Sequence, residues 1–235
     1  MARVRRSPGS WILRTLALLV IAFVLLQAWF AVMILWYRFE PPRRTAFMAE
    51  RLAELRKHDP AAELQYRYVP YERISANLKR AIVASEDAKF VEHDGFDWDG
   101  IRLAREKNRA KGKVVAGGST ITQQLAKNLF LSPSRSYLRK GQEAIITVML
   151  EALLDKRRIL ELYLNVIEWG SGVFGAEAAA RHYDGVSAAQ LSTSQAARLA
   201  AMAPSPRRFE RNPRSAYLSG RMATIMARMP AAAYP

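Results

Sequence analysis

Acidic residues gather where a predicted helix gives way to a loop. Glu86 and Asp87 end a helical pattern whose apolar positions share one face: Ile74, Leu78, Ala81 and Ile82. The next segment, KFVEHDGFDWDG, adds a histidine and more carboxylates, namely His93, Asp94, Asp97 and Asp99. A carboxylate at a helix end beside such a loop could act as a general base. Turn formation explains the aspartates equally well, and their spacing to the histidine is not diagnostic of a metal site.

The stretch VVAGGSTITQQLAKNLFL combines glycines with a polar helix face. Thr120 and Gln123 have the spacing of a capping box, which predicts that a helix begins directly after the glycines. One face of that helix is apolar, with Ile121, Leu125 and Leu129, and the opposite face is polar, with Thr120, Gln123, Gln124 and Lys127. Spacing alone favours an ordinary amphipathic helix. Two glutamines and a lysine above a glycine-rich helix start also suit a ligand with hydroxyls and phosphates.

A second candidate carboxylate lies in the motif RKGQE. Arg139 and Lys140 precede Glu143 by four and three residues, which is ion-pair spacing on one helix. A surface ion pair is the simplest interpretation of the spacing. If folding brings Glu143 near Glu86, the two carboxylates would match the pair that enzymes use at an anomeric carbon.

Two glycine patterns suggest nucleotide sites that the surrounding sequence does not support. Gly170-x-Gly172-x-x-Gly175 follows a helical pattern instead of a strand, so it does not predict a dinucleotide-binding βαβ unit. Gly112-x-x-x-x-Gly117 lacks the lysine and hydroxyl residue that a P-loop needs. Glycines that lead into a helix N-terminus can nevertheless attract anions.

The elements that must position these residues are mostly helices. Only QYRYV, before Pro70, resembles a strand, whereas alanine-rich helices are expected around Gly175–Tyr183 and Ser187–Met202. We predict a mainly α chain with four parts: an N-terminal segment (1–14), a membrane anchor (15–37), a connector (38–70) and a helical domain (71–235). The connector includes a predicted amphipathic helix at Thr45–His58.

An uncleaved membrane anchor explains the apolar N-terminal run. Leu16 to Tyr37 contains one strongly polar residue, Gln27, and its length suits a helix that crosses a bilayer. The run is too long for a signal peptide and lacks a small-residue cleavage site. Arginines lie on both sides of it, so the positive-inside rule favours a cytoplasmic N-terminus only modestly.

The positive net charge indicates anionic partners but does not identify which kind. The chain of 235 residues has a formal net charge of +15 and no cysteine, which excludes disulfides and thiolate metal sites. The basic residues are spread through helical patterns and form no basic tail, so the charge alone decides little; nucleic acid is not an expected partner because the domain should face away from it.

Five motifs occur together in one order: EDAKFVEHDGFD, GGSTITQQLAKNLFL, RKGQE, KRRILELYLNVIEWGSGVFGAEAAARHY and RLAAMAPSPRRF. They cover most of residues 81–209, and with them the chain resembles the peptidoglycan glycosyltransferases, specifically the monofunctional biosynthetic type of Gram-negative bacteria. The resemblance implies a lysozyme-like helical domain that polymerises lipid II into β-1,4-linked glycan strands. The transfer inverts the donor and releases undecaprenyl pyrophosphate.

The same resemblance implies roles for individual residues. Glu86 matches the general base that deprotonates the acceptor hydroxyl, and Glu143 matches a second glutamate that orients the pyrophosphate or a divalent ion. Five positions match residues that bind donor sugar and phosphates: Ser119, Gln124, Lys127, Arg135 and Lys140. Mg²⁺ or Mn²⁺ is a candidate cofactor, with a dependence that varies within the family.

Partners and location follow from the resemblance and the anchor. We expect an inner-membrane protein with a periplasmic catalytic domain that contacts lipid II, the growing lipid-linked strand and membrane lipids. Cell-wall synthesis or division proteins are further candidate partners. Apolar residues at Val114-Val115 and Leu129–Leu131 are expected to dip into the outer leaflet. Asp184 stands where the family usually has Phe, and without a Ser-x-x-Lys motif we expect no transpeptidase domain.

Two other functions compete with polymerisation. A hydrolase on the same fold would cut glycan by admitting water to the anomeric carbon. A catalytically silent scaffold would only anchor partners, although the matched positions keep their Glu, Lys and Arg residues. A nucleic-acid binder, which the charge alone suggests, is the weakest alternative.

Overall fold

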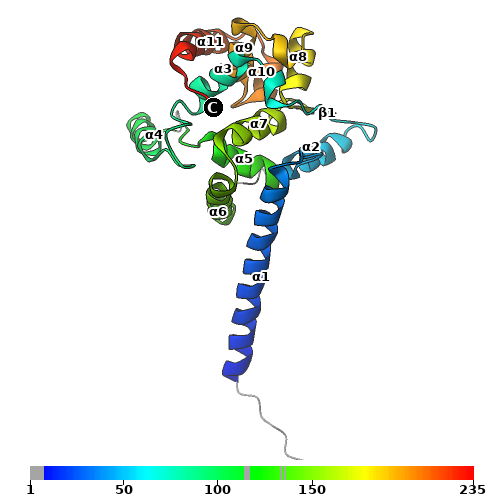
Figure 1. Ribbon diagram of the computed structural model, residues 1–235, viewed down its shortest axis with the longest axis vertical. Helices are drawn as coiled ribbons and strands as arrows, with labels where there is room; N and C mark the ends of the chain where they lie inside the picture. The colour runs from blue at the N-terminus through cyan, green and yellow to red at the C-terminus, as the bar shows by residue number, and fades with distance from the viewer. Residues whose placement is uncertain (1–7, 114–116, 133, 135) are drawn as a thin grey trace, which may run out of the picture.

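The computed structural model describes residues 8–113, 117–132, 134 and 136–235, which form a helical domain on a long N-terminal helix (Figure 1). The α-helices are α1 (Pro8–Tyr37), α2 (Ala46–Arg56), α3 (Ala76–Glu86), α4 (Trp98–Lys111), α5 (Ile121–Phe130), α6 (Tyr137–Leu153), α7 (Lys156–Val166), α8 (Ala176–Asp184), α9 (Thr193–Met202), α10 (Pro206–Arg211) and α11 (Ala216–Arg228). Short 3-10 helices are η1 (Tyr71–Arg73), η2 (Ala188–Gln190) and η3 (Met229–Ala231), and the strands are β1 (Gln65–Tyr66), β2 (Glu168–Gly170) and β3 (Val173–Phe174). A mainly helical chain with one N-terminal helix long enough to span a membrane is confirmed.

Most of α1 is exposed, as a membrane-spanning helix should be. Its segment Trp11–Tyr37 is apolar enough to cross a bilayer, and only 11% of its most apolar window is buried within the protein. Near the end of α1, Phe30 and Ile34 become buried, and the Phe30 ring lies 5.3 Å from that of Phe130 in α5. The last turns of the anchor are therefore part of the domain.

A polar pair also joins the anchor to the domain. Gln27 in α1 and Gln142 in α6 exchange two amide hydrogen bonds, of 3.0 and 2.9 Å. Arg158 of α7 adds a hydrogen bond from its Nε to the carbonyl of Tyr37, at 2.8 Å. Because amides facing lipid need hydrogen-bond partners, the pair favours one placement of the domain on the anchor.

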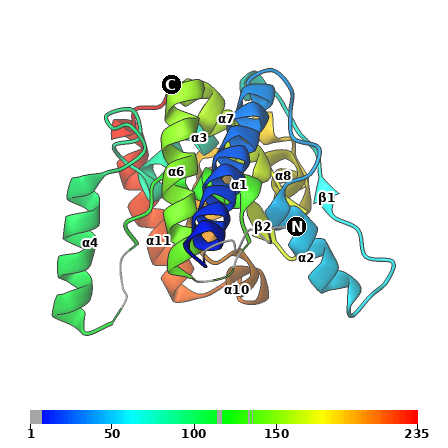
Figure 2. The ribbon, with the colours of Figure 1, turned by 90° about the horizontal axis from the view of Figure 1, so that it is seen from below.

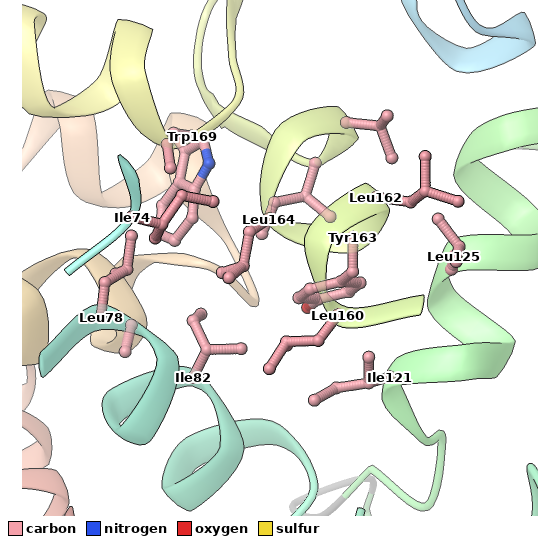
Figure 3. Close-up of a cluster of buried hydrophobic side chains, with 14 of the residues drawn as sticks. Ile74, Leu78, Ile82, Ile121, Leu125, Leu160, Leu162, Tyr163, Leu164 and Trp169 are labelled. Atoms are coloured by element: carbon pink, nitrogen blue, oxygen red, sulfur yellow. The ribbon is translucent and has the colours of Figure 1, made fainter. Parts of the chain in front are cut away.

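Four helices, α3, α5, α7 and α9, build the hydrophobic core. Figure 3 shows side chains from α3, α5 and α7 pointing toward one another, with Trp169 of β2 closing one end. In α3 the apolar residues recur at helical spacing and form one stripe, whereas α7 is buried on nearly all sides, from Ile159 to Val166. This packing fixes the end of α3 against the start of α5, where the candidate residues lie.

The segment before residue 71 also contributes to the core. In α2, Phe47 is buried, and the Phe47 ring lies 6.4 Å from that of Phe174 in β3. Arg51 binds Glu168 of β2 at 3.2 Å, and hydrogen bonds from Arg207 and Arg51 lower the pKa of Glu54 to about 2. Charged contacts thus tie α2 to β2 and α10.

Of the three strands in the described residues, only β1 lies in a segment that the sequence predicted to be a strand; β2 and β3 were not predicted. β3 pairs in parallel with β1 and antiparallel with β2, in the order β1-β3-β2. The glycine pattern after α7 forms this hairpin, because Gly172 and Gly175 adopt positive φ angles of 76° and 82°. Strands of two or three residues are too short to produce a readable alternation.

Two predicted helix boundaries were wrong. Ile74 precedes α3, because Ser75 is the N-cap and accepts a hydrogen bond from the amide of Leu78. The predicted helix at Ser187–Met202 is divided into η2 and α9, since Ser192 starts a new capping box with Gln195. In both cases a serine side chain captures a backbone amide and ends one element before the next.

Asp184, the departure from the usual Phe, is accommodated by a charge. Its Oδ1 accepts a hydrogen bond from Arg198 Nη2 at 3.0 Å, and Arg198 also binds the carbonyl of Tyr183 at 3.0 Å. An ion pair therefore joins the end of α8 to α9 at this position.

Candidate active site

Asp87 holds the end of α3 against the start of α5. Its side chain is 2% exposed and accepts hydrogen bonds from His93 Nε2 at 2.9 Å and from the amide of Ile121 at 3.0 Å. The second bond satisfies one of the free amides at the start of α5. The predicted capping box of Thr120 and Gln123 is confirmed and satisfies two more. Asp87 thus has a structural explanation, whereas its neighbour Glu86 remains directed toward a cavity.

Neutral groups bind one oxygen of the Glu86 carboxylate. Glu86 Oε2 accepts a hydrogen bond from Gln124 Nε2 at 3.0 Å, and Gln124 Oε1 in turn accepts one from the Tyr163 hydroxyl at 3.0 Å. Burial raises the pKa of Tyr163 well above its ordinary value, so its phenol stays protonated and donates. This chain sets the orientation of the Gln124 amide and, through it, of the carboxylate.

The other oxygen faces Ser85 and a residue far along the chain. Glu86 Oε1 lies 3.2 Å from the Ser85 hydroxyl and 3.5 Å from Arg221 Nη2, and Arg221 also donates to Ser85 at 3.0 Å. Arg221 belongs to α11, so helices from both ends of the domain meet at this carboxylate. The Glu86 side chain is 9% exposed and still lines a cavity.

A cationic cluster lies beyond the other end of Gln124, on α5 and α6. Glu143 is 3% exposed and binds both Arg139, at 2.6 Å, and Lys140. Lys140 Nζ also lies 3.5 Å from Ser119 Oγ. The predicted ion pair is confirmed, but it is buried on the carboxylate side. Glu143 therefore fixes the positions of two cations instead of facing the cavity as a free base.

Lys127 is the cation in this cluster that lacks a direct partner. Burial lowers its pKa, an effect that the Glu143 carboxylate partly offsets. Within the described residues, its ammonium group has no hydrogen-bond acceptor, and the Phe47 ring lies 5.7 Å away. A partly buried ammonium without an acceptor is suited to an anionic ligand.

Two cavities contain these groups. The first, of about 290 Å³, is lined by Glu86 together with residues that include Asp97, Gly118, Ser119 and Arg228. The second, of about 370 Å³, is lined by Gln124, Lys127, Arg139, Tyr163 and Glu168, among others. The domain thus has a carboxylate in the first cavity and cations in the second.

The structure brings together most of the residues that the sequence proposed. Glu86 contacts Gln124, and Ser119 lies beside Lys140 and thereby near Glu143. Arg135 and Val114-Val115 lie outside the described residues. Sequence reasoning missed Arg221 and Ser85, and it treated Arg139 as an ion-pair partner only. The Arg139 spacing to Glu143 was visible, but nothing in the sequence linked α11 to Glu86.

The described side chains do not form a site for Mg²⁺ or Mn²⁺ by themselves. No group of three His, Asp or Glu residues occurs among residues 8–113, 117–132 and 136–235 that could hold a metal ion. Glu143, the carboxylate that the sequence analysis proposed for a divalent ion, already forms ion pairs with Arg139 and Lys140.

Comparisons with known proteins match most of the chain. A family model described as Transglycosylase matches residues 52–230. The chain is 60% identical over 227 residues to a biosynthetic peptidoglycan transglycosylase of Dechloromonas aromatica (strain RCB), covering 97% of this chain and 98% of that protein. A Janthinobacterium (strain Marseille) protein of the same description is 58% identical over 99% of this chain and all of its own length. A third, from Chromobacterium violaceum, is 57% identical over 92% and 95% of the two chains.

The chain belongs to the biosynthetic peptidoglycan transglycosylase family. The resemblance drawn from the five motifs is confirmed, and so is the enzyme class, a peptidoglycan glycosyltransferase. The match to the transglycosylase model begins at residue 52, inside α2, and includes every element that lines the two cavities except the first turns of α2. The two cavities, which together we call the cleft, are therefore part of the transglycosylase domain.

Proposed function

We propose that the enzyme polymerises lipid II by inverting glycosyl transfer, with Glu86 as the general base. The observation that carries the proposal is the position of Glu86 in one cavity, joined through Gln124 to a second cavity that contains Lys127 and Arg139. An acceptor hydroxyl needs a base, and a pyrophosphate leaving group needs cations. The two cavities supply both, and Gln124, which binds Glu86, also lines the cavity that contains Lys127 and Arg139.

In the proposed step, Glu86 removes the proton from the 4-hydroxyl of the acceptor GlcNAc. The oxygen forms a bond to C1 of the donor MurNAc while the bond from C1 to the pyrophosphate oxygen breaks. Attack opposite the leaving group inverts C1 and gives a β-1,4 linkage. Undecaprenyl pyrophosphate leaves with the bonding electrons, and the proton remains on Glu86 until solvent takes it.

The cationic cluster stabilises the charge that develops on the leaving group. Lys127 can bind a phosphate oxygen directly because its ammonium group lacks an acceptor in the described residues. Lys140 and Arg139 are held in position by Glu143, so they need no reorganisation when the charge appears. Glu143 thus acts through the cations, and Ser119 and Gln124 are proposed to bind the sugars.

We further propose that the N-terminus lies in the cytoplasm and the catalytic domain in the periplasm, against the inner membrane. α1 supports a single membrane anchor, and its junction with the domain at Phe30 and Ile34 keeps the cleft close to the bilayer. This placement suits a substrate whose lipid tail stays in the membrane. The chain has no cysteine, so an exposed serine such as Ser219 replaced by Cys would report its side of the membrane by labelling of intact cells.

Polymerisation of labelled lipid II by the detergent-solubilised full-length protein tests the reaction. Glu86→Gln keeps the shape of the side chain but cannot accept the proton, so we expect the rate to fall by about 10²–10⁴-fold. Glu92→Gln, at an exposed glutamate in the following loop, is the matched control and should keep full activity. Full activity of Glu86→Gln would overturn the assignment of the base. Release of soluble muropeptides from purified sacculi would instead identify a hydrolase.

A further inference from the structure

α4 is the least buried helix of the domain and carries a dense positive charge. From Trp98 to Lys113 the chain has six basic residues against two acidic ones, and all six are exposed: Arg102, Arg105, Lys107, Arg109, Lys111 and Lys113. The helix contacts the domain through Ala104, which is buried, and Ile101, whose Cα lies close to Gly118. Almost the whole circumference of α4 therefore faces outward.

The basic residues of α4 form a stripe that the protein leaves mostly uncompensated. Arg102, Arg105 and Arg109 are three and four residues apart, so their side chains share one face of the helix. Arg102 pairs with Asp99 at 2.9 Å, whereas Arg105 and Arg109 form no ion pair within the described residues. A stripe of this kind favours an anionic surface.

Large apolar side chains accompany the charge. Trp98, at the start of α4, is 71% exposed and stacks on Phe96 with 5.3 Å between ring centroids, and Leu103 is 51% exposed. Tryptophan beside basic residues is typical of helices that lie in the headgroup region of a bilayer. Removing these apolar side chains from water would be favourable.

The position of α4 relative to the anchor selects the bilayer as the partner. Figure 1 shows α4 at the edge of the domain, somewhat farther from the free end of α1 than the turns where α1 joins the domain. Figure 2, which views the domain from the side on which α1 leaves, shows α4 along its full length with no other element in front of it. Because Gln27 and Gln142 fix the domain on α1, this exposed side stays turned toward the membrane.

We propose that α4 docks on anionic lipid headgroups and forms a second, electrostatic membrane contact beside the anchor. The arginine stripe binds the headgroup phosphates, and Trp98 and Leu103 enter the headgroup region. A basic residue at an anionic surface favours the docked state about fivefold, so three arginines together favour it by about a hundredfold. The contact therefore depends on lipid charge and weakens with salt.

A single fluorescent label on α4 tests the proposal in the full-length protein. Since the chain has no cysteine, Ala110→Cys, at an exposed position, accepts one bimane group without removing a charge. The protein is reconstituted in vesicles of phosphatidylcholine alone or of equimolar phosphatidylcholine and phosphatidylglycerol. We expect severalfold less quenching by neutral acrylamide in the anionic vesicles, with the difference lost in high salt. Equal quenching in the two vesicles would overturn the proposal.

Two matched triple variants separate the stripe from overall charge. In the test variant, Arg102, Arg105 and Arg109 are each replaced by Gln, and the lipid-dependent protection should disappear. In the control, Arg208, Arg211 and Arg214 are each replaced by Gln, which changes the net charge equally, and protection should persist. Protection that survives in the test variant, or is lost in both, would refute a specific role for α4.

Two further measurements keep the result interpretable. The thermal midpoint of each variant shows whether it folds, and if the test variant does not, the salt and lipid dependence of the otherwise unchanged labelled protein decides the question. Soluble polyphosphate added to phosphatidylcholine vesicles should leave the label exposed. Protection by polyphosphate would identify a soluble polyanion as the partner and overturn docking on lipid.

Discussion

Arg221 provides the sharpest test of how the fold prepares Glu86. Its Nη2 lies 3.0 Å from Ser85 Oγ and 3.5 Å from Glu86 Oε1, yet Arg221 does not line either cavity of the cleft. The residue can therefore orient the carboxylate without touching substrate. Arg221→Met keeps much of the side chain's length and removes both the charge and the donors.

The structure sets the size of the expected effect. Opposite charges 3.5 Å apart attract by about 5 kcal/mol at an effective dielectric constant of about 20. The Arg221 side chain is 29% exposed, so water compensates most of that loss, and a net value of about 1.5–3 kcal/mol is typical of a hydrogen bond to a charged group. If this energy orients the carboxylate for proton transfer, kcat falls by about 10–100-fold. KM should stay within about twofold because the cavities keep their lining.

Initial rates of lipid II polymerisation over a range of lipid II concentrations give kcat and KM separately. Arg221→Lys should recover part of kcat, since an ammonium group can replace one of the two contacts but not both. Arg228→Met is the matched comparison, because Arg228 lies on the same helix but lines the cavity that contains Glu86, so its loss should raise KM. A rise in KM with unchanged kcat in Arg221→Met would refute the positioning role. So would a fall in thermal stability large enough to explain the lost activity.

Three other changes have definite expected outcomes. Glu143→Gln leaves Arg139 and Lys140 without their carboxylate and should lower the free energy of unfolding by about 2 kcal/mol, which thermal unfolding measures. The loss is smaller than for a fully buried pair because the Lys140 side chain is about half exposed. Gly175→Ala places a Cβ 2.6 Å from the Asn165 carbonyl at φ 82° and should cost about 3 kcal/mol, whereas Gly141→Ala, with open space around it, should not destabilise. Burial lowers the pKa of Lys127, so its cation is lost as pH rises through that lowered value, and KM for lipid II should increase at alkaline pH in the native enzyme but not in Lys127→Arg. Between the lowered folded pKa and the unfolded value of 10.5 the unfolded chain binds more protons, so stability should rise with pH there, and unchanged stability would contradict the sign.

Local signals in the sequence predicted the parts of the site that lie close together in the chain. The capping box at Thr120 and the ion pair of Glu143 depend on residues three or four apart, and the structure confirms both. The end of α3 at Glu86 was also predicted, because the apolar stripe stops there. Each of these features lies within one helix, so the periodicity and spacing of residues were sufficient to predict it.

Contacts between distant elements were not predictable in this way. Arg221 lies 135 positions after Glu86, and no local pattern indicates that α11 returns to the end of α3. The Gln27–Gln142 pair is similar, since a lone glutamine in an apolar run gives no information about its partner. The motif resemblance identified the enzyme class and proposed most of the site residues, but it did not provide these supports.

The two glutamates of the cleft illustrate why residue type alone does not assign a role. Glu143 has two cations in direct contact and 3% exposure, so its charge is already compensated and its oxygens are occupied. Glu86 has an amide on one oxygen and, on the other, a hydroxyl with a single guanidinium group at 3.5 Å, and it borders a cavity. Only the second environment leaves a carboxylate lone pair available to an entering hydroxyl. The two roles that we propose, proton transfer at Glu86 and charge stabilisation through Glu143, therefore follow from packing, since each carboxylate meets a different set of helices.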